Sequence, residues 1–227
     1  MKKVAVILSG CGVYDGSEIH EAVFTLLSLE QQNTSYECFA PDKDQLHVVN
    51  HITGKEMNES RNVLVESARI ARGDIKPLNE LQIADFDGLA FPGGFGAAKN
   101  LNQWAISGPN GAIDLQVKDL ILQAIEERKA LLALCMGPTV VAKALEGSKY
   151  KAKLTVGSDV EASPYEIAAI SQGMESIGAE VAMKTLQEVM VDEELKIVSA
   201  PCYMMEGSIS DIFNNIQSAV KRFAAVL

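Results

Sequence analysis

The residue with the most evident chemistry is Cys135, which ends the run of small and aliphatic residues Ala130–Leu134. Gly137 and Pro138 follow it, and helix-forming residues continue from Val140 to Leu145. This pattern predicts a buried strand that turns sharply into a helix, with the thiol at the corner. Because a cysteine there faces the positive end of a helix dipole, we expect its pKa to be lowered and its thiolate to be favoured.

Two further glycine-containing loops follow apolar runs in the same way. The three loops are Gly10–Gly16, Pro92–Gly96 and Cys135–Pro138. Ligands bind outside the carboxyl ends of parallel strands, and glycine lets backbone N–H groups approach a ligand closely. Two such N–H groups beside a thiol would form an oxyanion hole. A single loop of this kind could simply make a corner, and a free cysteine is often a small buried hydrophobe. The three loops together indicate a site.

The elements that must position these loops alternate along the chain. Strands are expected over 3–9, 36–40, 87–91, 130–134, near 154–156, and over 180–184, 188–191 and 196–199. Helices are expected over 18–29, 62–71, 112–128, 165–177 and 208–226, the first with Ser17 as its N-cap. Residues 42–60 form a long polar excursion, and residues 192–194 the turn of a hairpin. Alternating strands and helices predict a three-layer α/β sandwich with a parallel core. We expect one domain over residues 1–227.

Composition restricts the partners of the chain. Its 227 residues carry a net charge of −10, which argues against nucleic acid or an anionic membrane as a partner. His47 and His51 have no second ligand pair, so no metal is expected. The apolar run Val4–Leu8 is shorter than the roughly 7–15 residues of a signal-peptide core. A cytoplasmic protein with reduced cysteines is therefore expected.

The motifs around the three loops resemble a known superfamily. Cys135–Thr139, Pro92–Gly96 and Glu18 are similar to the three-part active site of the ThiJ/PfpI superfamily of class I glutamine amidotransferase-like proteins. Leu8–Ala22, together with Asn50–Gly54 and residues 92–101, resembles its ElbB-type branch. The resemblance covers nearly the whole chain. It implies a flavodoxin-like three-layer α/β/α sandwich with a mainly parallel sheet.

The same resemblance implies the roles of several residues. Cys135 would be the nucleophile and Glu18 its carboxyl partner, and the N–H groups of Gly94 and Met136 would be the oxyanion donors. Relatives are often homodimers, and ElbB-type proteins are described as glyoxalases or as accessory factors in isoprenoid synthesis. The PfpI-type proteases place a histidine directly after the cysteine, where this chain has Met136. Amidotransferase relatives supply a late histidine, but none follows His51 here.

Three functions remain open at this stage. The leading one is a cofactor-independent glyoxalase that acts on a small reactive aldehyde such as glyoxal or methylglyoxal, with His20 and Cys11 as possible accessory residues. A non-enzymatic redox sensor or an accessory protein with a reactive cysteine is the second. A dinucleotide enzyme is the third, although Gly16 comes one residue late for the GxGxxG pattern. Cys38 and Cys202 are interpreted as core or loop thiols.

Overall fold

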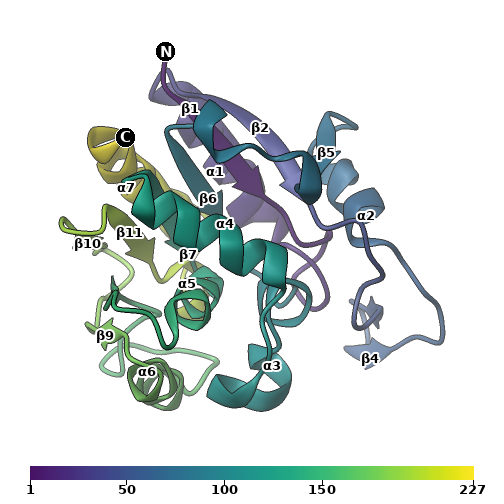
Figure 1. Ribbon diagram of the computed structural model, residues 1–227. Helices are drawn as coiled ribbons and strands as arrows, with labels where there is room; N and C mark the ends of the chain where they lie inside the picture. Colours follow the sequence, from purple (N-terminus) through teal and green to yellow (C-terminus); the bar gives the residue numbers. More distant parts are fainter.

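A seven-stranded sheet forms the centre of the computed structural model, which describes residues 1–227 (Figure 1). Its strand order is β10-β11-β7-β6-β1-β2-β5, and every neighbouring pair is parallel except β10 with β11. The strands are β1 (Lys3–Ile7), β2 (Ser35–Ala40), β5 (Ile75–Pro77), β6 (Gly88–Phe91), β7 (Ala130–Leu134), β10 (Met190–Asp192) and β11 (Ile197–Ala200). The expected flavodoxin-like sandwich with a mainly parallel sheet is confirmed.

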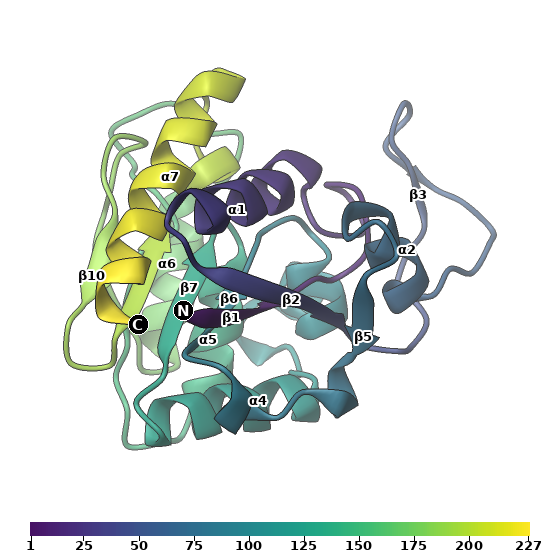
Figure 2. The same cartoon turned by 90° about the horizontal axis from the view of Figure 1, so that it is seen from above.

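Helices cover both faces of this sheet. Seen from above, α1 (Ile19–Gln31) and α7 (Ile209–Val226) lie side by side over one face, and α4 (Leu115–Glu126) lies against the other (Figure 2). α5 (Gly137–Leu145) packs beside α4 and against β7. None of the helices combines the length and the apolar character needed to cross a membrane. The remaining helices are α2 (Val63–Ile70), α3 (Trp104–Ser107) and α6 (Ile167–Ser176), with short helical turns at Leu78–Glu80, Ile83–Asp85, Ala97–Leu101, Gly108–Asn110 and Cys202–Met204.

The central strands are those whose sequences are apolar throughout. Every residue of β6 and β7 is buried, as are four of the five residues of β1. A strand buried on both faces needs apolar side chains on both, which is why these runs do not alternate. Their carboxyl ends therefore meet at one edge of the sheet, and the three predicted loops leave from that edge.

Some elements differ from the prediction. The short edge strand β5 was not expected, because Ile75–Pro77 carries no apolar run. β8 (Lys153–Leu154) and β9 (Glu180–Val181) pair with each other in a separate small sheet. Within residues 42–60, β3 (Val49–Asn50) and β4 (Lys55–Glu56) form a small hairpin. The predicted hairpin is present, since Asp192 accepts the backbone N–H groups of Glu194 and Leu195 at its turn.

Candidate active site

Cys135 stands at the corner between β7 and α5, as predicted. Its backbone is in the left-handed region, with φ of +55°, a conformation that costs a non-glycine residue roughly 1–2 kcal/mol. Its N–H donates to the carbonyl oxygen of Ala200 in the neighbouring strand at 3.0 Å. Met136 is the N-cap of α5. The strained turn points the thiol at the carboxyl edge of the sheet, where its residue is only 5% exposed.

The carboxyl group at this thiol belongs to Glu21, in the first turn of α1. Glu21 is fully buried, and its Oε2 and the Cys135 sulfur both lie against the backbone of Gly93. Its Oε1 accepts the backbone N–H of Tyr203 at 3.1 Å, whereas Oε2 has no hydrogen-bond partner of its own. The two groups can meet because residue 93 is glycine: a Cβ at Gly93 would overlap both Cys135 and Glu21 Oε2. The Cys135 thiol is therefore the group that is available to hydrogen bond with Glu21 Oε2.

Burial decides the protonation of this pair. It raises the pKa of Glu21 to about 8, with a further contribution from the charge of Glu18. It also raises the pKa of the Cys135 thiol well above its usual value, and the Glu21 carboxylate adds to the rise. The backbone N–H groups of Gly94 and Met136 lower the Cys135 pKa, but less than burial raises it. The expectation of a lowered thiol pKa is therefore wrong.

Glu18 is not the hydrogen-bonding partner of Cys135, and this expectation is corrected. Glu18 is the N-cap of α1, and its Oε2 accepts the N–H of Glu21 at 2.7 Å. Ser17, the predicted N-cap, uses its hydroxyl instead to accept the N–H of Ser9 at 2.9 Å. The helix therefore begins one residue later than predicted. The residue three positions after the cap, Glu21, then faces the sheet and the thiol.

A cleft of about 550 Å³ opens beside this pair. It is lined by Val13, Tyr14, Glu18, His20, Pro164, Tyr165, Tyr203, Met205, Glu206 and Gly207, and no lysine or arginine is among them. Tyr165 connects the cleft to the thiol: burial raises its pKa to about 12, and the charges of Cys135 and Glu21 contribute next. His20 Nδ1 lies 2.9 Å from the Tyr203 hydroxyl and 3.9 Å from Glu18 Oε1. The predicted accessory residue His20 is thus a cleft residue, on the Glu18 side.

Comparison with known proteins fits this geometry. A human protein named glutamine amidotransferase-like class 1 domain-containing protein 3, mitochondrial, is 39% identical over 97% of this chain and 81% of its own length. The chain belongs to this amidotransferase-like family. A crystal structure of an isoprenoid biosynthesis protein with an amidotransferase-like domain from Ehrlichia chaffeensis has a TM-score of 0.90 at 32% identity, covering 100% of this chain and 99% of that one.

A more distant protein shares the fold. DJ-1beta from Drosophila melanogaster superposes with a TM-score of 0.53 at 14% identity, covering 99% of this chain and 95% of that one. No family model matches the chain. The amidotransferase-like family is thus confirmed by the human relative, and the likeness to DJ-1beta is one of fold. The narrower likeness to the ElbB-type branch stays a prediction.

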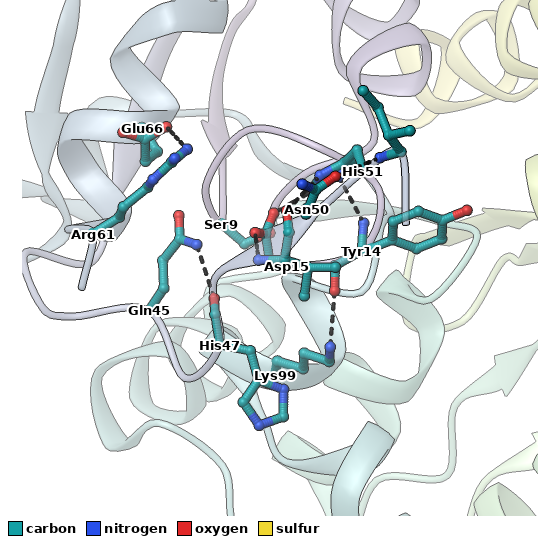
Figure 3. A network of polar contacts seen from close by, with 12 residues as sticks. Ser9, Tyr14, Asp15, Gln45, His47, Asn50, His51, Arg61, Glu66 and Lys99 are labelled. Atoms are coloured by element: carbon teal, nitrogen blue, oxygen red, sulfur yellow. Dashed lines mark hydrogen bonds and ion pairs between the residues drawn. The ribbon is translucent and has the colours of Figure 1, made fainter. Parts of the chain in front are cut away.

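In this family member the polar excursion of residues 42–60 braces the first glycine loop (Figure 3). Asp15 Oδ2 accepts the N–H of Val49 at 2.6 Å. His51 Nε2 accepts the N–H of Tyr14 at 3.2 Å, while its Nδ1 lies 3.0 Å from the carbonyl oxygen of Val49. Lys99 Nζ donates to the Tyr14 carbonyl oxygen at 2.8 Å. The excursion therefore positions Tyr14 in the wall of the cleft.

The same loop is a poor phosphate site, because its N–H groups already have partners. Gly10 donates to Ser67 Oγ at 2.8 Å, and Gly12 donates to the Ser17 carbonyl oxygen at 2.8 Å. The N–H of Gly16 donates to the carbonyl oxygen of Gly12 at 2.7 Å, within the same loop. A pyrophosphate would need these donors free. The geometry argues against the dinucleotide enzyme.

The other cysteines are placed differently from one another. Cys11 lies in the first glycine loop next to Gly10, which donates to Ser67 of α2, and the charged groups that act on the Cys11 pKa are Glu66, Arg69 and Asp15. Cys202 is fully buried, two residues after Ala200, whose carbonyl oxygen accepts the N–H of Cys135, and Cys135 is among the groups that act on its thiol. Sequence reasoning missed this neighbour. The one signal in the sequence was that Cys202 comes two residues after the end of β11, the strand next to β7.

Proposed function

We propose that this protein is a glutathione-independent glyoxalase, which converts glyoxal or methylglyoxal to glycolate or lactate. The observation that carries the proposal is the buried contact between Glu21 and Cys135 at Gly93, with the backbone N–H groups of Gly94 and Met136 among those that act on the thiol. These groups supply a nucleophile, a proton carrier and two donors for an oxyanion. The cleft beside them is lined by no lysine or arginine, which suits a neutral dicarbonyl compound.

The first step begins from the pair with one proton removed. The remaining proton can lie on Cys135 or on Glu21. The reactive form has it on Glu21 and leaves a thiolate on Cys135. The sulfur adds to the aldehyde carbon, and the carbonyl oxygen becomes an anion beside Gly94 and Met136. Glu21 gives this oxygen its proton, and a hemithioacetal results. The low-dielectric surroundings strengthen the two N–H contacts to the oxyanion.

The second step moves a proton between the two carbons of the substrate. A carboxylate removes the proton from the carbon bonded to sulfur, a proton is returned to the neighbouring carbon, and the hydroxyl proton passes from the first oxygen to the second, which leaves the thioester of the hydroxy acid. Glu21, now ionised, lies at the sulfur. Glu18, whose pKa burial raises, lines the cleft and remains the proposed second carrier. Water then breaks the carbon–sulfur bond, which releases the hydroxy acid and restores the thiol.

A second candidate is an accessory role in isoprenoid synthesis, which the name of the 32% identical Ehrlichia chaffeensis protein supports. In that role Cys135 and the cleft would bind a partner molecule without turnover. The cytoplasmic location and the homodimer stay predictions, and the human relative is named mitochondrial.

Turnover of the aldehyde distinguishes the two candidates. Purified protein is incubated with methylglyoxal without added glutathione, and lactate is measured by chromatography. The matched control is Cys135→Ala, prepared identically so that contaminating glyoxalases are the same in both samples. We expect lactate from the wild type at a rate clearly above the control. Equal rates in the two samples would refute the glyoxalase proposal and leave the accessory role.

A further inference from the structure

Cys202 is held beside Cys135 by hydrogen bonds on both sides of it in the chain. Ala200, two residues before Cys202, accepts the N–H of Cys135 at 3.0 Å. Tyr203, the next residue after it, donates its N–H to Glu21 Oε1 at 3.1 Å. Cys135 and Glu21 thus both hydrogen bond to the segment that carries Cys202. Cys202 itself is fully buried, and Glu21 and Cys135 are among the groups that act on its thiol.

The backbone of Cys202 is strained for a side chain of its kind. Its φ is +49°, in the left-handed region that glycine and asparagine occupy more easily. Its N–H is fixed in this conformation by Asn215 Oδ1 at 3.0 Å. Both cysteines at the sheet edge therefore have positive φ, whereas the remote Cys38 lies in the regular strand β2. A thiol kept at a strained position, next to a second thiol, indicates a role for its sulfur.

We propose that Cys202 is a resolving cysteine, which forms a reversible disulfide with Cys135 when Cys135 is oxidised by a peroxide. This inference does not rest on the proposed glyoxalase activity. The disulfide would remove the nucleophile from use while the oxidant is present. It would also prevent oxidation of Cys135 to the sulfinic state, which thiols do not reverse.

The chemistry proceeds in two steps. The Cys135 thiolate attacks one oxygen of hydrogen peroxide, the O–O bond breaks, and the leaving hydroxide takes the proton held on Glu21, so that a sulfenic acid and water result. The Cys202 sulfur then attacks the Cys135 sulfur, the S–O bond breaks, and the oxygen leaves as water with the proton from Cys202. Two thiols have lost two electrons, and one peroxide has become two waters. The second step needs the Cys202 sulfur deprotonated, and Glu21 is the nearest carboxylate that acts on it.

The test maps the oxidation products of the folded protein. Wild type is treated with hydrogen peroxide, free thiols are blocked with iodoacetamide under denaturing conditions, and the peptides are analysed without reduction by mass spectrometry. We expect a cross-linked pair of peptides containing Cys135 and Cys202, lighter by about 2 Da than the two thiol peptides and separated by dithiothreitol. In Cys202→Ser, Cys135 should instead gain about 32 Da, at least about tenfold more than in wild type at the same dose.

Controls separate this pairing from general oxidation. Cys38→Ser removes a buried thiol from β2 and should behave as wild type. Cys202→Gly suits the positive φ and provides a second variant whose fold is checked by circular dichroism. The wild-type peptide map decides the question even if both variants at position 202 fail to fold. Sulfinic acid on Cys135 without a cross-link to Cys202, a cross-link to another cysteine, or no oxidation at all would overturn the proposal.

Discussion

Replacing Glu21 with Gln removes a buried acid whose ionisation opposes folding. In the unfolded chain this carboxyl titrates near 4.5, and in the folded protein burial raises its pKa to about 8. Between these two values the folded protein binds a proton that the unfolded chain has lost. Wild-type stability therefore decreases as the pH rises through this window. Glu21→Gln keeps the shape and the hydrogen-bonding capacity, and carries no charge at any pH.

The size of the effect follows from the width of the window. It spans about 3.5 pH units, and each unit is worth 1.36 kcal/mol, so the largest difference is about 5 kcal/mol. We expect the free energy of unfolding of Glu21→Gln to rise relative to wild type from pH 4.5 to pH 8.5, by a few kcal/mol. The variant should be the more stable protein at the alkaline end.

The assay is urea unfolding followed by circular dichroism at a series of pH values across this range. Glu30→Gln is the matched control, since Glu30 lies in the same helix with its side chain exposed, and its difference from wild type should stay within about 0.5 kcal/mol. A difference between Glu21→Gln and wild type that stays flat over the whole range would refute the assignment of a buried, protonated carboxyl at the thiol.

Three other predictions follow from the same geometry. Alkylation of Cys135 by iodoacetamide should be slow near pH 6 and accelerate through about pH 8, where Glu21 loses its proton; a rate that is already maximal at pH 6 would contradict the raised pKa values. Gly93→Ala should reduce turnover by at least about 100-fold, because a Cβ displaces the sulfur from Glu21, and steady-state kinetics measures the loss. His51→Ala should lower stability by about 1 kcal/mol and raise KM more than it lowers kcat, because Tyr14 loses a brace without any change at the thiol; chemical denaturation and kinetics check both effects.

The corner at Cys135 could be predicted from the sequence because its causes are local. An apolar run, a glycine and a proline are enough to indicate strand, turn and helix. The glycine loops could be placed at one edge of the sheet for a similar reason, since parallel strands bring their carboxyl ends together. These local features predict where a site lies, but they do not predict which of its groups are protonated.

The carboxyl partner could not be chosen in this way. Ser17 and Glu18 are both good N-caps, and the choice between them depends on whether the Ser17 hydroxyl is already occupied by Ser9. The direction of the Cys135 pKa shift depends on burial by α1 and by the segment after β11, which are far away in the chain. The proximity of Cys202 has the same long-range origin. Strand order alone does not show which side chains point inward.

The order of the strands has a consequence for the protein during its synthesis. The carboxyl partner of the thiol lies near the start of the chain, the thiol itself at residue 135, and the segment that anchors both at residues 200–203. A nascent chain can place the first two only after its last strand has left the ribosome. Until then Cys135 lacks the burial that the segment gives it in the folded protein. Protection of this one cysteine from a thiol reagent therefore reports that the chain has been made through residue 203 and has folded onto the sheet.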